Sequence, residues 1–294
     1  MFVEAIERVD PFVRPILSIM RTYGGSEIIP ACSTMFFVNE QGCAVTCRHV
    51  AESLQNADAI YQNFLGFQGE RKLHQRDRNY LQKLAQLEQK YGLKPETVIR
   101  IRHQFMQAVE QPAQVVFHFH PTQDLAVIRF LGYRKTLYSS YAVFLRDSSK
   151  IKQGKYLCRL GYPFPEFRNY RYNTDLDDIE WTNDGRADTP RFPIDGIVTR
   201  LRAENGQIVA VEMSTPGLLG QSGGPLFDTN GIIYGMQSIT RHLHLGFDVV
   251  DREVVVNGRR TKVSNHPFLN VGDCVHVDVI KQFLRELGIK YYEE

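Results

Sequence analysis

The chain has 294 residues, of which 43% are hydrophobic and 23% are charged, and its formal net charge is +2. This near-balance argues against nucleic acid or an anionic membrane surface as the main partner. No segment approaches the roughly 18 consecutive apolar residues of a membrane span, and the acidic N-terminus lacks the pattern of a secretory signal. We therefore expect a globular, cytoplasmic protein with one large domain or two small ones.

The N-terminal segment and the strands after it lead to a histidine. Residues 2–22 show helical spacing in two pieces, the second capped by Asp10 with a proline at its first position. The pattern then changes to short extended runs, and residues 34–38 and 43–46 predict two strands joined by a four-residue turn. This hairpin delivers the chain to His49, at the start of a short helical turn.

Residues 60–112 interrupt the strand pattern. Apolar side chains recur at helical spacing over residues 80–91, Gly92 ends that run, and a second run covers residues 95–109, which together predict a helical hairpin. Between residues 70 and 102 there are nine basic and four acidic side chains. We expect either a solvated helix surface or a docking surface for an acidic regulatory protein.

Strands resume at residues 114–120 and 124–130, and short extended runs continue through the second half of the chain. Residues 249–270 form an excursion with a hairpin around Gly258, and residues 277–287 carry an apolar helical stripe. Many short strands in two similar blocks predict a mostly β protein built from paired Greek-key barrels.

The cysteines and histidines offer few metal-ligand patterns. Five scattered cysteines with no export signal favour free thiols over a disulfide framework. The closest pair lacks a second pair at ligand spacing, so we expect no zinc there. Two histidine pairs could in principle share a metal, but ordinary strand or loop histidines are the simpler interpretation; we predict neither a metal nor a cofactor. The cysteines are Cys32, Cys43, Cys47, Cys158 and Cys274, and the histidine pairs are His118 with His120 and His242 with His244.

The composition of the glycine-rich stretch at residues 215–227 is unsuited to a packed element and suited to a reactive loop. Ser222 sits there among four glycines and two prolines. Glycine allows positive φ angles and close approach of a substrate, and the N–H groups of Gly220 and Ser222 could both point at a developing oxyanion. A glycine-rich turn without chemistry is the alternative, unless a base and an orienting carboxylate lie elsewhere.

Both partners can be found in the sequence. A serine hydroxyl is a weak nucleophile that needs a base within hydrogen-bond reach, and His49 follows a strand at a point where its imidazole can project into a cleft. Asp124 opens an apolar strand, so its carboxylate requires a partner, for which the N–H of an imidazole is suited. The order His, Asp, Ser is one of the few in which such triads occur.

These residues resemble the chymotrypsin-like serine protease family, and within it the bacterial trypsin-like and HtrA-like branch. Val45-Thr-Cys-Arg-His-Val50 is similar to the family's Val-Thr-Ala-Ala-His-Val, and Asp124-Leu-Ala-Val127 to its Asp-Leu-Ala-Val. Gly220-Gln-Ser-Gly-Gly-Pro-Leu226 is similar to its Gly-Asn-Ser-Gly-Gly-Pro-Leu. With Ser33-Thr-Met-Phe-Phe-Val38, four motifs follow one another in family order, over roughly residues 28–290.

The resemblance implies two six-stranded Greek-key β-barrels of the chymotrypsin-like type, with an inserted helical hairpin and terminal helices. The expected division is an N-terminal helical segment at residues 1–26, a first barrel at 27–135 and a second barrel with the C-terminal helix at 136–294. The resemblance further implies a serine endopeptidase in which His49, Asp124 and Ser222 form the triad. Water then releases the product from an acyl-enzyme.

The resemblance also implies a substrate site for a polypeptide. The segment Ser238-Ile239-Thr240, preceded by Gln237, would bind the peptide as an added β-strand. Pro216 stands six residues before the serine, where an acid would select Arg or Lys, so we expect a small or medium apolar residue beside the cut. Gln221 replaces an aspartate that pairs with a newly cut N-terminus in digestive proteases, so we expect no such activation. The alternative is a catalytically silent scaffold whose cleft binds peptide.

Overall fold

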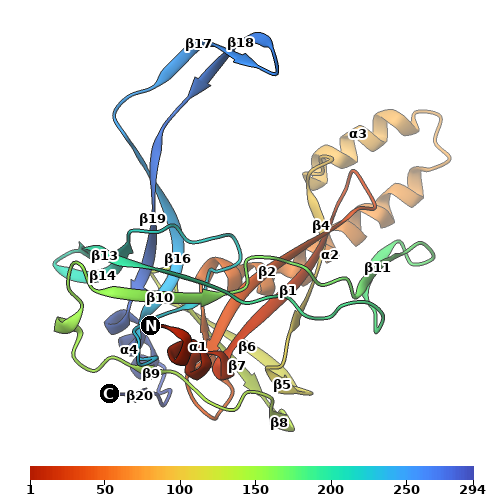
Figure 1. The fold of residues 1–294 in the computed structure, drawn as a ribbon. Helices are drawn as coiled ribbons and strands as arrows, with labels where there is room; N and C mark the ends of the chain where they lie inside the picture. The colour runs from red at the N-terminus through yellow and green to blue at the C-terminus, as the bar shows by residue number, and fades with distance from the viewer.

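The computed structural model describes residues 1–294 and shows a mostly β protein with few helices (Figure 1). Six strands form a curled sheet in the order β4-β1-β2-β3-β7-β6. Its end strands β4 and β6 do not pair with each other, so this sheet is a half-barrel and not the closed barrel expected. The strands are β1 (Val13–Thr22), β2 (Ile28–Phe37), β3 (Cys43–Thr46), β4 (Val98–Phe105), β6 (Gln114–Phe119) and β7 (Ala126–Leu131).

The second sheet closes into a ring. Its strands follow the order β15-β10-β13-β14-β19-β16, and β15 pairs again with β16, which gives the six-stranded ring that the sequence predicted. Outside the ring, β9 pairs in parallel with β16, and β20 pairs in parallel with β9. The strands are β9 (Val143–Phe144), β10 (Tyr156–Gly161), β13 (Phe192–Glu204), β14 (Gln207–Met213), β15 (Pro225–Phe227), β16 (Ile233–His244), β19 (Phe268–His276) and β20 (Tyr292–Glu293).

One apolar core joins the two sheets. A single cluster of 54 buried residues includes side chains from both, and Phe36 of β2 contacts Phe144 of β9 with ring centroids 6.3 Å apart. Burial of such aromatic side chains removes a large apolar area from water. The half-barrel and the ring are therefore held against each other, with the functional loops at their junction.

The N-terminal segment differs from the predicted pair of helices. Helix α1 (Val3–Val9) and the short 3₁₀ helix η1 (Asp10–Phe12) are present, but β1 is a strand where the second helix was expected. It pairs with β2 on one side and β4 on the other. The prediction was wrong because strand pairing along both edges decided the conformation of this Val- and Ile-containing run.

The inserted segment is a helical hairpin, shifted towards the N-terminus of its predicted range. Helix α2 (Arg48–His74) starts at the predicted single turn and continues for 27 residues, and α3 (Tyr80–Tyr91) ends at Gly92 in a left-handed C-cap. The run predicted as the second helix is strand β4, which fills the free edge of β1. Its apolar spacing fits both structures, and its β-branched residues suit a strand.

The remaining elements are small, apart from a hairpin arm. The C-terminal helix α4 (Val277–Glu286) is present as predicted. Strands β17 (Val249–Val256) and β18 (Arg259–Asn265) pair only with each other and project from the body of the protein (Figure 1). No helix has both the length and the apolar character needed to cross a membrane. The other elements are β5 (Val109–Glu110), β8 (Lys135–Thr136), η2 (Ser148–Lys150), β11 (Tyr170–Asn173) and β12 (Asp178–Trp181).

Candidate active site

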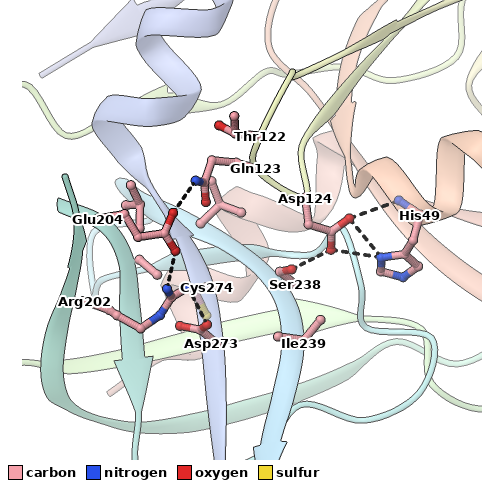
Figure 2. A pocket seen from close by; sticks show the side chains of 13 residues that line it. His49, Thr122, Gln123, Asp124, Arg202, Glu204, Ser238, Ile239, Asp273 and Cys274 are labelled. Carbon is pink, nitrogen blue, oxygen red and sulfur yellow. Dashed lines mark hydrogen bonds and ion pairs between the residues drawn. The ribbon is translucent and has the colours of Figure 1, made fainter. Parts of the chain in front are cut away.

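Two segments that are distant in the sequence bring a histidine and an aspartate together. His49 lies in the first turn of α2, directly after β3, and Asp124 lies on the connection between β6 and β7. The imidazole Nδ1 is 2.9 Å from Asp124 Oδ2 and 3.0 Å from Oδ1 (Figure 2). The backbone N–H of His49 also donates to Oδ1, at 3.0 Å. One carboxylate therefore fixes both the ring of His49 and the start of its helix.

Asp124 is held ionised by these contacts. A further hydrogen bond comes from the hydroxyl of Ser238, 2.5 Å from Oδ2 (Figure 2). Burial works to raise the pKa of Asp124, but the hydrogen bonds from His49 and Ser238 outweigh burial and lower the pKa to about 2. A charged carboxylate beside Nδ1 keeps the proton of a neutral imidazole on that nitrogen and leaves Nε2 as a base.

Ser222 joins the same cleft from the loop between β14 and β15. A cavity of about 340 Å³ is lined by both His49 and Ser222, together with Ser238 and Thr240. The Ser222 hydroxyl donates to the carbonyl of Ser238 at 3.1 Å and makes no hydrogen bond with His49. The structure thus places His49 and Ser222 on one cleft and bonds Asp124 to the His49 imidazole, with the Ser222 hydroxyl turned to the neighbouring strand.

The backbone around Ser222 is fixed by β2 and leaves two donors unused. The Thr34 N–H donates to the Ser222 carbonyl at 3.0 Å, and the Thr34 hydroxyl donates to the Gly220 carbonyl at 2.8 Å. Gly220 and Gly223 have positive φ angles, and a Cβ on Gly223 would lie 2.0 Å from the Thr34 carbonyl oxygen. The N–H groups of Gly220 and Ser222 have no acceptor within the chain. Two free donors beside a serine hydroxyl are suited to an oxyanion.

Gln221 fixes the loop from within. Its side chain is fully buried, accepts from the Leu218 N–H and donates to the Phe192 carbonyl, each at 3.0 Å. Both the oxygen and the nitrogen of the Gln221 amide are therefore bonded to the protein's own backbone. The loop is shaped here without a charged N-terminus as a partner.

The floor of the substrate site contains an arginine that the sequence analysis missed. Arg159 of β10 is 1% exposed, and its guanidinium donates to the Gln237 side chain at 2.5 Å and to the carbonyls of Thr215 and Pro216 at 3.0 and 3.2 Å. Burial lowers its pKa. An arginine in the middle of an otherwise apolar run, Tyr156-Leu-Cys-Arg-Leu160, was the available signal.

The predicted pocket residues narrow the space beside Ser222. The Thr240 hydroxyl donates across the site to the Gly217 carbonyl at 2.7 Å, and the Gln237 amide donates to the Ile239 carbonyl at 3.0 Å. A Cβ on Gly217 would lie 2.4 Å from the Gln237 amide nitrogen. Gln237 fills the space next to that wall, while Ile239 is 48% exposed at the cleft.

A larger polar cavity adjoins Asp124 on its other side. It has a volume of about 550 Å³, and Figure 2 shows an ion-pair chain along its wall. Arg202 lies between Glu204, at 2.6 Å, and the buried Asp273, at 2.9 Å, and Gln123 donates to Glu204 at 3.0 Å. The charged groups of this wall are paired with one another.

The potential metal ligands are engaged in other interactions. Cys47, His49 and Asp124 offer three ligand atoms within 4.8 Å of one another. The Cys47 thiol, however, donates to the Gln237 carbonyl, and burial and the nearby Asp124 raise its pKa well above the usual value. A thiol held protonated is a poor ligand. In the second histidine pair, His242 contacts Asn270 and His244 contacts Asp248.

Comparisons with known proteins bear on the family and the fold of this chain. A model of the trypsin-like peptidase domain matches residues 32–236. Among solved structures, the HtrA-type protease AlgW with a decapeptide is similar, at 12% sequence identity and a TM-score of 0.52, over 97% of this chain and 67% of that chain. A serine-to-alanine variant of AlgW with a decapeptide matches at 12% identity and a TM-score of 0.49, over 98% and 68%. No curated protein matches the chain by sequence.

The matched residues make up more than half of the chain, which therefore belongs to the trypsin-like peptidase domain family. Its fold is a trypsin-like one, with a curled half-barrel sheet and a ring sheet, and it is related to that of HtrA-type proteases.

Proposed function

We propose that this protein is a serine endopeptidase that uses His49, Asp124 and Ser222. The observation that carries the proposal is the combination, in one cleft, of an imidazole held by an ionised carboxylate with a serine that is flanked by two free N–H donors. Each part has a role in acyl transfer.

The reaction follows from these groups. Ser222 attacks the peptide carbonyl while His49 Nε2 accepts its proton, and the N–H groups of Gly220 and Ser222 stabilise the oxyanion. His49 then protonates the leaving amine, and water releases the acyl-enzyme by the reverse sequence. The Ser222 hydroxyl must first leave the Ser238 carbonyl and turn towards His49.

The proposed substrate is a polypeptide with a small residue before the scissile bond. The relative AlgW was solved with a decapeptide, and Ser238–Thr240 offers the strand edge on which a peptide can be added. The Thr240 hydroxyl that reaches Gly217 and the Gln237 side chain both restrict the pocket. At the floor of the site, the backbone carbonyl of Pro216 accepts a hydrogen bond from Arg159.

We further propose that a partner protein regulates the site through the inserted hairpin. Four basic groups of residues 70–102 are already paired: Lys83 with Asp77 and Lys90 with Glu70 within the hairpin, and Arg100 and Arg102 of β4 with Asp178 of β12. The remaining basic side chains of the segment are available to an acidic partner. Casein digestion by the isolated chain without delay would contradict this regulation.

The second candidate is a scaffold of the protease fold that binds peptide without cutting it. The observation in its favour is that the Ser222 hydroxyl bonds to the Ser238 carbonyl and not to the imidazole. The two candidates predict the same peptide binding, and they differ only in whether a covalent acyl-enzyme forms.

Labelling with a fluorophosphonate separates the candidates. The wild type should be labelled, whereas Ser222→Ala and His49→Ala should not, and their turnover should fall by roughly 10⁶-fold. Ser264→Ala, on the exposed arm, is the matched control and should be labelled like the wild type. A wild type that stays unlabelled, also with peptides and candidate partners added, would support the scaffold.

A further inference from the structure

Strand β16 continues well past the segment expected to bind peptide. It runs to His244, and from Ile239 onwards one of its edges is paired with β19. On the other side, β15 pairs only with the start of β16, up to Met236, and β9 pairs only at Ile233. From Ser238 to His244 the second edge of β16 has no neighbouring strand.

The hydrogen bonds around β19 show which backbone groups face that open edge. Gly272 lies opposite Thr240, but its N–H donates to Thr215 on the far side, at 2.9 Å. The Thr240–Gly272 pair is therefore a non-hydrogen-bonded pair, and the N–H and C=O of Thr240 point to the open edge. The Leu245 N–H donates back across the hairpin to Pro267 at 3.0 Å, which agrees with this alternation.

Two more residues of β16 direct their backbone groups to the open edge, as Thr240 does. Because backbone groups of successive residues point to opposite edges, His242 and His244 also direct their N–H and C=O outwards. No acceptor or donor within the chain faces these groups. Their surroundings are open, since His242 and His244 are both exposed. A row of unpaired backbone groups is a template for another strand.

From this edge we infer that the site binds a long extended segment of its polypeptide substrate, reaching seven residues before the scissile bond. The inference rests on the proposed function, because it takes the occupant to be substrate. The edge is continuous with Ser238, whose carbonyl contacts the Ser222 hydroxyl, so a peptide seated at the serine lies at the start of the open edge. Antiparallel pairing then directs the amino-terminal side of the peptide towards His244.

The geometry assigns a register to the bound peptide. Both strands advance about 3.4 Å per residue, so pairing at one position fixes the others. Counting backwards from the scissile bond, the third residue pairs with Thr240, the fifth with His242 and the seventh with His244. The fourth and sixth residues point their backbone groups to solvent. A net contribution of roughly 0.5–1.5 kcal/mol for each hydrogen bond corresponds to about two- to twelvefold in affinity.

Peptides methylated at single backbone nitrogens test this register. N-methylation of the third, fifth or seventh residue should lower kcat/KM by about two- to twelvefold, because it removes a donor on the paired side. The same change at the fourth or sixth residue is the matched control and should have little effect. Equal losses at the fifth and sixth residues, or no loss beyond the third, would overturn the inference.

A variant of the protein tests the same edge from the other side. His242→Pro removes the outward N–H without removing a bond to β19, and proline is tolerated on an edge strand. It should lower kcat/KM for an eight-residue peptide by about two- to twelvefold, because one hydrogen bond to the fifth residue is lost, while His242→Ala should not. Unchanged cleavage of the long peptide by His242→Pro would contradict the inference, and the methylated peptides remain decisive if this variant misfolds.

Binding measurements keep this inference separate from the proposed function. Failure of fluorophosphonate labelling would reject the peptidase but leave the edge testable, because Ser222→Ala should still bind the eight-residue peptide with the same alternation of N-methyl effects in calorimetry. A labelled enzyme without that alternation would reject the edge alone. Dimerisation that competes with the peptide would assign the edge to a second copy and overturn the inference.

Discussion

The loop that carries Ser222 and the arm formed by β17 and β18 contrast in how the fold holds them. The serine loop is enclosed by both sheets: its carbonyls accept from Thr34, and Gln221 is bonded at both ends of its amide. The arm pairs only with itself, and an isolated two-stranded hairpin is marginally stable at best. The groups proposed for catalysis are thus rigidly placed, whereas the element beyond the open edge is free to adapt to what binds.

The largest difference should appear between two aspartates that both contact histidine. Asp124→Asn should lower kcat for a short peptide by about 10⁴-fold, because an amide favours the wrong tautomer of His49. Asp248 at the base of the arm lies 2.7 Å from His244 and 2.9 Å from His266. Asp248→Asn should leave kcat within about twofold, as expected for a surface substitution. Steady-state kinetics of the two variants measure the contrast, and equal losses would contradict it.

The low pKa of Asp124 makes the stability of the fold depend on pH. The folded-state pKa of about 2 lies below the unfolded value of about 3.9, so the ionised carboxylate stabilises the fold above about pH 4. This contribution is lost as the pH falls towards about 2. The free energy of unfolding in urea should therefore decrease more steeply over this window in the wild type than in Asp124→Asn. Parallel curves would show that Asp124 does not stabilise the fold.

Two glycines with positive φ angles, one in the serine loop and one in the arm, differ in the space around them. In Gly223→Ala the new methyl group would meet the Thr34 carbonyl at 2.0 Å, whereas at Gly258, in the turn of the arm, no atom lies within 4 Å. Strain and overpacking should cost Gly223→Ala roughly 2–6 kcal/mol and abolish labelling of Ser222. Gly258→Ala should cost about 1 kcal/mol and leave labelling intact. Urea unfolding and fluorophosphonate labelling would show whether the loop is as closely enclosed as the contacts indicate.

Two leucines extend the comparison to side-chain burial. Leu226, directly after the serine loop, is fully buried, whereas Leu245, where the arm begins, is 51% exposed. Leu226→Ala should lower the free energy of unfolding by roughly 2–5 kcal/mol, and Leu245→Ala by less than about 0.5 kcal/mol. A large loss for Leu245→Ala in the isolated protein would mean that the arm packs against the body in solution.

The sequence predicted elements best where the signal was local. Gly92 as a helix end, the turn at Asn257-Gly258 and the apolar stripe of α4 are written in neighbouring residues, and all three are present. β1 and β4 were predicted as helices because their pairing with each other joins segments that are distant in the chain, which local spacing does not reveal. The open first sheet escaped prediction for the same reason, since closure depends on whether two remote edges meet.

The candidate site divides in the same way. His49, Asp124 and Ser222 stand in short motifs, so their residue types could be chosen from the sequence, and their roles remain predictions for the labelling experiment. The buried Arg159 beneath the pocket became visible only with its acceptors, which come from other segments.

The amino-acid sequence by itself determined the local chemistry: a hydroxyl in a glycine-rich loop, an imidazole after a strand, and a carboxylate at the edge of an apolar run. Only the tertiary structure decided that the hydroxyl and the imidazole line one cleft with the carboxylate bonded to the imidazole. It also decided that the Ser222 hydroxyl bonds to the Ser238 carbonyl and that β16 keeps an unpaired edge as far as His244. The physical reason is that propensities and turns depend on adjacent residues, whereas hydrogen bonds between strands and the burial of charge depend on segments that only folding brings together.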